Sequence, residues 1–394
     1  MTTQTTTHRI VVLGAGYTGM LAAIRLARRT RKLDVRITLV NPSDRFTERL
    51  RMHQIAAGQE LGDHRIPALL EGTGVEFVQG RATAIDPERR MVRVDDAVTL
   101  PYDELIYALG SSTDTSIVPG AAEHAWTLND PREAHRFAER LAAVAARGGA
   151  VVVSGGGLTG IEVAAEIAEQ YPDLTVTLVS TGQPGAMMGE KARAYLNRVL
   201  DRLGVVREIG RKVIKVLPDA IELAGGATLP ADLTLWTAGV RVSPLAAESG
   251  IETDARGLIV VDPTLRSVSH PDIRAIGDAA AVRQAWGQVH GTCQSGLPTA
   301  DYTVAAIVAQ LRGKPVRPFR FGYFHQPVSL GRRDAVIQFT KADDTPGRFY
   351  LTGRAARMYK ESVSSSPLNA YRMGMKIDIP VQLSKGGKAT RATA

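Results

Sequence analysis

Cysteine is almost absent from this chain of 394 residues, which contains only Cys293. A lone thiol cannot form a disulfide within the chain, and it cannot run a dithiol relay, which needs two thiols. Structural disulfides and internal dithiol redox chemistry are therefore excluded by count.

Long apolar runs are lacking as well. No stretch of about 18 uninterrupted apolar residues, the length of a membrane-spanning helix, occurs in the sequence. The first nine residues are polar, and no apolar signal core follows them. We therefore expect a cytoplasmic protein, and its length favours two domains with an appendage over a single core.

The net charge of +8 is spread unevenly along the chain. From residue 311 onward, 16 Lys and Arg stand against 5 Asp and Glu, a balance of +11, so the first 310 residues carry −3. A basic C-terminal face can attract an anionic membrane surface, an acidic protein or phosphates. A solvated basic tail explains the same charges. Membrane contact is expected to be at most peripheral, on the inner face, and no nucleic-acid partner is expected.

A long-range repeat organises the sequence. Residues 9–19 read Arg-Ile-Val-Val-Leu-Gly-Ala-Gly-Tyr-Thr-Gly, and residues 150–160 read Ala-Val-Val-Val-Ser-Gly-Gly-Gly-Leu-Thr-Gly. Each copy is an apolar run, a glycine turn and a helical pattern, and a β-branched run follows at 35–40 and at 174–179. Two copies framed in this way predict two dinucleotide-binding sites.

Each glycine of such a turn has its own task. The first permits the tight turn, the second lets the backbone approach a pyrophosphate, and the third lets helix and strand pack closely. The helix N-terminus meets the anion with free N–H groups and a positive dipole. These tasks fall on Gly14, Gly16 and Gly19 in the first copy and on Gly155, Gly157 and Gly160 in the second.

Three further apolar strands, at 103–110, 232–239 and 273–280, end in small or glycine residues. They indicate that the first unit is split and that the second is inserted into it. The predicted fold class is α/β: two Rossmann-like, doubly wound dinucleotide-binding domains with a smaller C-terminal α+β region. The expected boundaries are 1–115 and 251–320 for the split first domain, 116–250 for the second, and 321–394 for the C-terminal region.

At these motifs the sequence resembles the two-dinucleotide-binding-domain flavoproteins, and within them the type II NADH dehydrogenase-like group, over about residues 8–330. The resemblance implies that the first domain holds FAD without a covalent bond and that the second binds NADH or NADPH. Asp278, in Gly277-Asp278, is then expected to bond the flavin ribityl chain, although a helix N-cap also explains an Asp there. The residues expected to contact the cofactors are Gly14, Ala15, Gly16, Tyr17, Thr18, Gly19, Asn41, Arg49, Ala82, Ala108, Gly110, Gly155, Gly157, Leu158, Thr159, Gly160, Ser180, Gly239, Gly277, Asp278 and Leu297.

The sequence departs from the dinucleotide fingerprint at two places. The acidic residue expected at the end of each second strand, where it binds ribose hydroxyls, is replaced by Asn41 and by Ser180. Losing the carboxylate at Ser180 removes the repulsion that excludes a 2′-phosphate. NADPH use therefore stays open beside NADH use, with Lys191 or Arg193 as distant phosphate partners.

The resemblance also suggests site residues. Glu162 would bond the nicotinamide carboxamide, and Glu162→Ala would then slow hydride transfer while thermal stability barely moves. The alternative is a first-turn helix charge. Gln294 could stand for a glutamine near the flavin. Further acceptor-side candidates are His53, Gln54, Lys360 and Glu361.

Lacking a cysteine pair, the chain departs from the disulfide reductases and sulfide–quinone oxidoreductases of this superfamily. Cys293 is then either a small residue packed near the cofactor or a reactive thiol. A helix beginning near Thr299 would point its N-terminus at the flavin edge. No metal site is expected.

Near the C-terminus, apolar and polar residues alternate strictly from Tyr371 to Leu383, which predicts a strand. Such a strand could complete a sheet or form a homodimer through the C-terminal region. Residues 384–394 are expected to be disordered.

The expected function is transfer of hydride from NAD(P)H to flavin N5 and of electrons onward to a quinone or quinone-like small acceptor. Two alternatives remain: a ferredoxin- or rubredoxin-type reductase, and a redox sensor resembling apoptosis-inducing factor with little turnover.

Overall fold

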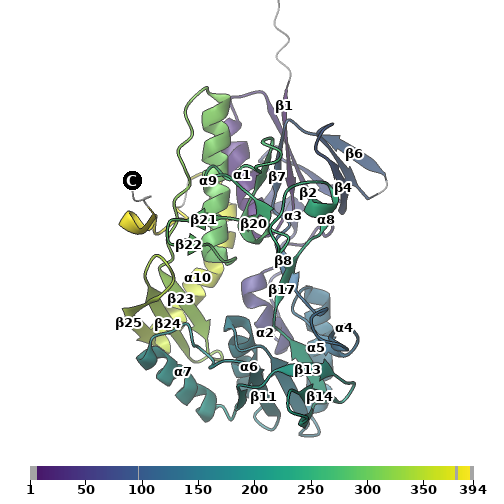
Figure 1. The fold of residues 1–394 in the computed structure, drawn as a ribbon, viewed down its shortest axis with the longest axis vertical. Helices are drawn as coiled ribbons and strands as arrows, with labels where there is room; N and C mark the ends of the chain where they lie inside the picture. Colours follow the sequence, from purple (N-terminus) through teal and green to yellow (C-terminus); the bar gives the residue numbers. More distant parts are fainter. Residues whose placement is uncertain (1–6, 96, 378–379, 391–394) are drawn as a thin grey trace, which may run out of the picture.

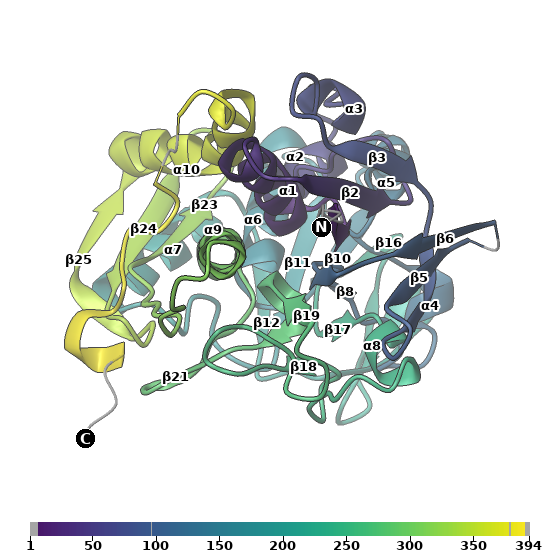
Figure 2. The same cartoon turned by 90° about the horizontal axis from the view of Figure 1, so that it is seen from above.

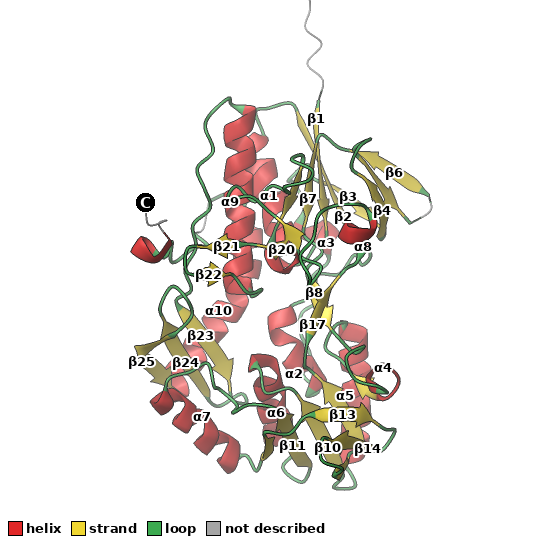
Figure 3. Cartoon of the chain, viewed as in Figure 1, coloured by secondary structure: helices red, strands yellow, loops and turns green. Residues whose placement is uncertain are grey.

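Two parallel sheets, one per glycine repeat, build the body of the protein (Figure 1). The structure is a computed structural model, and it describes residues 7–95, 97–377 and 380–390. The first sheet lies in the upper half of the molecule and the second in the lower half, and a third, antiparallel sheet stands beside them. Helices cover the sheets, as the colouring by secondary structure in Figure 3 makes clear.

The first sheet has the strand order β19-β7-β1-β2-β3, and all its pairings are parallel. Helices α1 and α9 pack side by side against it (Figure 2). Because these helices cover one face of the sheet and residues 85–94 pack on the other, β1 reads as a continuous apolar run, with residues 10–13 at most 2% exposed. The elements are β1 (His8–Leu13), α1 (Tyr17–Thr30), β2 (Val35–Asn41), β3 (Glu76–Gln79), β7 (Glu104–Tyr107), β19 (Ile273–Ala275) and α9 (Cys293–Leu311).

The second sheet repeats this plan, with the order β12-β11-β10-β16-β9. All of its strands lie in sequence between β7 and β19 of the first sheet, so the predicted insertion is confirmed. Its elements are β9 (Ala125–Trp126), α5 (Pro131–Ala145), β10 (Ala150–Ser154), α6 (Leu158–Gln170), β11 (Thr175–Ser180), α7 (Glu190–Arg202), β12 (Val206–Ile209) and β16 (Leu233–Trp236).

The chain passes from one unit to the other along a short ladder. On the way out it forms β8 (Ser111–Thr113), and on the way back β17 (Val240–Val242), and the two pair antiparallel. Figure 1 shows this ladder between the upper and lower halves.

Small elements that the repeat did not predict complete the two units. They are η1 (Arg49–Arg51), α2 (Met52–Ala56), α3 (Ile66–Leu69), β4 (Ala82–Asp86), β5 (Met91–Val94), β6 (Val98–Pro101), α4 (Ala121–His124), β13 (Val213–Val216), β14 (Ala220–Leu223), β15 (Thr228–Pro230), α8 (Leu245–Glu248), β18 (Ile259–Val260), η2 (Gly277–Ala279), β20 (Ala280–Ala281), β21 (Arg283–Gln284) and β22 (Gly287–Gln288).

The C-terminal region is α+β, as predicted: β23 (His325–Ser329), β24 (Ala335–Thr340) and β25 (Pro346–Thr352) form an antiparallel sheet, and α10 (Gly353–Met373) crosses it. The predicted strand from Tyr371 to Leu383 is wrong. Tyr371 lies in the last turn of α10 instead, because Leu368 and Tyr371 pack one turn apart into the core of the first unit. The described residues that follow α10 form no strand, and Leu383 is 71% exposed. Asp378 lies outside the described residues.

Two other expectations need correction. Residues 384–390 were expected to be disordered, but they contain the 3₁₀ turn η3 (Gly387–Thr390). Arg320 stabilises this turn, because it donates to Thr390 Oγ1 at 2.9 Å and to the Gly387 carbonyl. Residues 391–394 lie outside the described part. Helix α9 begins at Cys293 rather than near Thr299, because Thr292 and Ser295 form a reciprocal capping box. Pro298 is tolerated inside the helix.

Among the described residues, no helix is long and apolar enough to cross a membrane.

Candidate functional site

A cavity of about 1410 Å³ lies where the two units and the C-terminal region meet. Ligand pockets for a drug-sized molecule usually span about 300–1,000 Å³. The cavity can therefore hold a large cofactor together with a second molecule.

The first glycine turn enters this cavity with a backbone that only glycine satisfies. Gly14 has φ +96°, and a Cβ there would lie 2.5 Å from the Ala108 carbonyl oxygen. A Cβ on Gly19 would lie 1.8 Å from the Gly14 oxygen, so strand and helix pack against each other there. At Gly16 a Cβ would meet no atom within 4 Å, and Gly16 lines the cavity. Packing within the chain explains the first and third glycines, whereas Gly16 leaves room for a ligand.

The second glycine turn repeats this geometry. Gly155 has φ +127°, and a Cβ on it would lie 2.6 Å from Thr237 Oγ1. A Cβ on Gly160 would lie 1.8 Å from the Gly155 oxygen, whereas a Cβ on Gly157 would meet nothing within 4 Å. In both repeats the first and third glycines are required by packing within the chain, and the second leaves open space.

Two polar residues brace the first site. Asn41 accepts from the Ala15 N–H at 3.0 Å, so its side chain ties the end of β2 to the glycine turn. Asp278 accepts from Ser111 Oγ at 2.8 Å and lines the cavity. It lies inside the turn η2, whose N-cap is Ile276, so the N-cap explanation of Asp278 is wrong.

The structure brings most of the predicted cofactor residues to one cavity. Those that line it are Gly14, Ala15, Gly16, Tyr17, Thr18, Asn41, Arg49, Ala82, Ala108, Gly110, Leu158, Thr159, Asp278 and Leu297, and with them the two catalytic candidates Glu162 and Gln294. Gly19, Gly155, Gly157, Gly160, Ser180, Gly239 and Gly277 are not part of its lining.

Glu162 faces the C-terminal region. It is 7% exposed, its Oε1 lies 2.7 Å from Lys360 Nζ, and it accepts from the Ser329 N–H at 3.0 Å. Burial alone would raise the pKa of Glu162, but Lys360, His53 and the hydrogen bonds together lower it. Helix α6 begins at Leu158, so Glu162 is beyond the first turn, and its charge is matched by Lys360 rather than by a helix end.

Two buried histidines flank this ion pair. His53 Nδ1 lies 3.8 Å from Glu162 Oε2, and His325 Nδ1 is 2.8 Å from the Tyr359 hydroxyl. The pKa of each is lowered to about 4, mainly by burial and with a smaller contribution from Lys360. Both imidazoles are therefore neutral at physiological pH, and Lys360 supplies the positive charge at this end of the cavity.

Gln294 is fully engaged by the backbone. Its Nε2 donates to the His325 carbonyl at 2.8 Å and its Oε1 accepts from the Phe324 N–H at 2.8 Å. The side chain thus fastens the start of β23 to α9, and Gln294 positions this wall of the cavity.

Cys293 is the first residue of α9 and lines the cavity. Burial, with a smaller contribution from Asp278, raises the pKa of its thiol to about 12. A thiol that stays protonated at neutral pH is a poor nucleophile, which favours the packing interpretation of Cys293 over the reactive one.

Sequence patterns missed several cavity residues. His325 and Tyr323 lie in and before β23, and His290 stacks on Tyr323 with ring centroids 4.4 Å apart. Met187 enters from the loop before α7. No motif marks these residues, because each reaches the cavity through contacts between distant segments. Among the described residues, no group of three or more His, Cys, Asp and Glu is placed to hold a metal ion.

One buried carboxyl beside the site gives a pH-dependent prediction. Glu166 is 1% exposed, and burial raises its pKa to about 7, although Gln59 donates to it. A raised pKa means that Glu166 contributes stability below its ordinary pKa of 4.5, and that this stability is lost as the pH rises through 7. Glu166→Gln should therefore gain about 1–3 kcal/mol relative to the wild type between pH 5 and pH 8.

Urea unfolding at several pH values measures this difference. Glu139→Gln, at an exposed position of α5, is the matched control and should track the wild type. Parallel pH profiles for wild type and Glu166→Gln would contradict the assignment of a raised pKa.

Comparison with known proteins agrees with this geometry. The model of the pyridine nucleotide-disulphide oxidoreductase family matches residues 8–296. An NADH dehydrogenase-like protein of Mycobacterium tuberculosis is 30% identical over 389 residues, covering 92% of this chain and 96% of that protein. The alternative NAD(P)H-ubiquinone oxidoreductase C1 of Arabidopsis thaliana is 28% identical over 379 residues, covering 84% of this chain and 72% of that protein.

Among solved structures, the sulfide:quinone oxidoreductase of Aquifex aeolicus superimposes with a TM-score of 0.81 at 20% identity, over 93% of this chain and 92% of that one. At that identity the likeness concerns the fold. With two glycine turns of the same geometry and a family model that matches nearly three quarters of its length, the chain belongs to the pyridine nucleotide-disulphide oxidoreductase family.

Proposed function

We propose that this protein is an NAD(P)H-dependent flavoprotein oxidoreductase that passes electrons to a quinone or quinone-like small acceptor. The observation that carries the proposal is the pair of open glycines, Gly16 and Gly157, each backed by a packed glycine on either side. The names of the M. tuberculosis and A. thaliana relatives support the same class of reaction.

The residues of the first unit fit FAD. Gly16 leaves space for a pyrophosphate at the N-terminus of α1, where free N–H groups face the cavity. Asn41 and Asp278 offer polar side chains to the ribose and ribityl parts. We assign FAD to residues 1–115 and 251–320, the nucleotide to 116–250, and a wall of the acceptor site to 321–394. FAD, when bound, accepts a hydride and releases electrons, chemistry that no side chain of this chain supplies.

The chain's own part in the reaction is to orient the cofactors and to stabilise the charge that develops on the acceptor. Lys360 Nζ is a cation held at the cavity by Glu162, and it also donates to the Pro327 carbonyl at 3.3 Å. A quinone gains negative charge as it is reduced, and a fixed ammonium group stabilises that charge and holds a proton at Nζ. Glu162 holds the Lys360 side chain in place.

A first test concerns the cofactor. The purified protein should be yellow and should release about one FAD per chain on acid precipitation, because Gly16 and Asp278 hold the cofactor by non-covalent contacts alone. Extraction followed by chromatography measures this ratio. A colourless protein that rebinds no added FAD would contradict the proposal.

A second test separates the acceptors. After anaerobic reduction by NADH or NADPH, soluble quinones should reoxidise the flavin faster than an iron–sulfur carrier protein does. Preference for the carrier would support the ferredoxin-type alternative, and slow reoxidation by every acceptor would support the sensor. The homodimer and the peripheral membrane contact expected from the C-terminal region stay predictions.

A further inference from the structure

The end of β11 lacks the carboxylate that binds the ribose hydroxyls of NADH in the dinucleotide fingerprint. Ser180 stands where the fingerprint has a carboxylate, and its hydroxyl donates to the carbonyl of Gly182 at 2.5 Å. The Ser180 hydroxyl thus points toward the loop that follows β11. A Cβ on the neighbouring Gly156 would lie 2.6 Å from Ser180 Cβ, so the glycine turn and this position are in direct contact.

Two basic residues, Arg211 and Lys212, follow the neighbouring strand β12. Ser180 pairs with Ile209 of β12, and beyond the end of β12 the Arg211 N–H donates to the Ser180 carbonyl at 3.1 Å. The Arg211 side chain is half exposed, and its Nε lies 3.7 Å from Glu208 Oε2, longer than a hydrogen bond. Lys212 follows and is exposed. Arg211 therefore lies directly beside Ser180, and Glu208 and Lys212 are near it in the chain.

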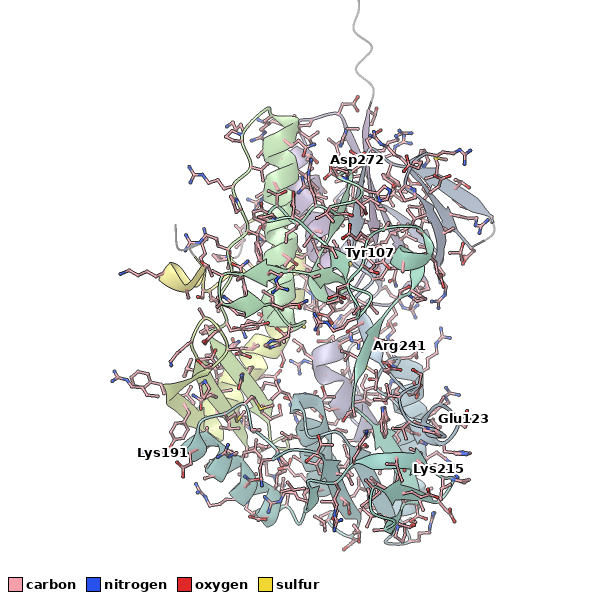
Figure 4. All side chains as sticks on the ribbon, in the orientation of Figure 1. Tyr107, Glu123, Lys191, Lys215, Arg241 and Asp272 are labelled. Carbon is pink, nitrogen blue, oxygen red and sulfur yellow. The ribbon has the colours of Figure 1, made fainter. Side chains whose placement is uncertain are left out.

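Of the two basic residues suggested by the sequence, Arg193 packs against the loop that follows β11, where a Cβ on Gly185 would lie 3.6 Å from Arg193 Cγ. Gly189, at the start of α7, donates to Gln338 of the C-terminal sheet at 3.0 Å. In Figure 4, Lys191 projects outward at the edge of the molecule beside that sheet. Lys191 is thus a suitable control.

We propose that Arg211, with Lys212, forms a subsite for the 2′-phosphate of NADPH; this inference rests on the proposed function. A guanidinium matches the geometry of a phosphate, because two of its N–H groups can donate to two oxygens. That of Arg211 is half exposed, and its ion pair with Glu208 runs through Nε at 3.7 Å. No carboxylate at position 180 opposes the anion. Glu208 supports the alternative of an NADH site, because its carboxylate could bind the free ribose hydroxyls of NADH.

Binding measured without turnover tests the subsite. Isothermal titration of the FAD-loaded protein with adenosine 2′,5′-bisphosphate and with ADP compares ligands with and without the 2′-phosphate. Arg211→Ala should weaken the bisphosphate about tenfold to a hundredfold, the usual worth of a charged hydrogen bond, and leave ADP unchanged. Ser180→Glu should weaken the bisphosphate similarly by repulsion, and Lys191→Ala should change neither ligand.

The outcomes separate the inference from the function on which it rests. If Arg211→Ala weakens both ligands equally, or neither, the 2′-phosphate subsite is wrong while nucleotide binding stands. Weakened ADP binding in Glu208→Gln, with the bisphosphate no tighter than ADP in the wild type, would instead make Glu208 the ribose carboxylate of an NADH site. If the wild-type protein binds neither ligand, the proposed function fails together with the inference.

Discussion

Gly157→Val is expected to abolish reduction of the flavin by NADH and by NADPH while leaving FAD content and thermal stability at wild-type levels. A Cβ at this position meets no atom of the chain within 4 Å, so we expect the fold to accept the valine and the valine to obstruct the proposed pyrophosphate site. Anaerobic stopped-flow measurement of flavin reduction gives the rate, and acid extraction gives the FAD content.

Matched variants define what each glycine does. Gly16→Val should yield a folded protein that has lost FAD, because the same open space lies in the first unit. Gly160→Val should fail to fold stably, since its Cβ would lie 1.8 Å from the Gly155 oxygen. If Gly157→Val loses FAD while its fold is intact, the assignment of the two units is reversed.

Glu162→Ala is expected to lower the free energy of unfolding by about 3–5 kcal/mol, because it leaves the buried ammonium group of Lys360 without its partner. This replaces the expectation from the sequence that thermal stability barely moves, which took Glu162 for a residue free to face the nicotinamide. Urea unfolding of the FAD-loaded variant and of the wild type measures the change.

A second variant separates structure from function at this pair. Replacing both charges, in Glu162→Gln with Lys360→Met, removes the unpaired charge and should recover most of the stability. If the pair also serves the reaction, the recovered protein should still turn over about tenfold to a hundredfold more slowly with a quinone, a barrier increase of about 1.4–2.7 kcal/mol. Wild-type turnover in the double variant would reduce the pair to a structural role.

The repeat made most of the fold predictable. Two glycine turns between β-branched runs fixed the order of strands and helices in both sheets, and the return of the chain at β19 followed from the Gly277-Asp278 turn. The end of α10 was not predictable from alternation, because a period of two is satisfied by any extended loop. The start of α9 was placed too late, near Thr299 and after Gly296-Leu297-Pro298, although the capping box of Thr292 and Ser295 starts the helix at Cys293.

The site was predictable to the extent that it is local. The glycines, Asn41 and Asp278 are marked by motifs. In the structure Gly14, Gly16, Asn41 and Asp278 line the same cavity. The partner of Glu162 was beyond reach, because Lys360 lies nearly 200 residues away and arrives on a helix that crosses from the third sheet. The same holds for Arg211, which meets Ser180 only through the pairing of two strands.

The ladder between β8 and β17 has a consequence for how this architecture is assembled. The chain leaves the first unit and re-enters it at two places that are hydrogen-bonded neighbours, with Ser111 opposite Val242. An insertion whose two ends touch can be exchanged for another unit, or for a short turn, without moving any strand of the host sheet. The second unit is therefore an insertion that can be replaced as a whole. A replacement would have to dock on α2 of the host, which packs against α5 and α6, and on the C-terminal sheet, which packs against α6 and α7.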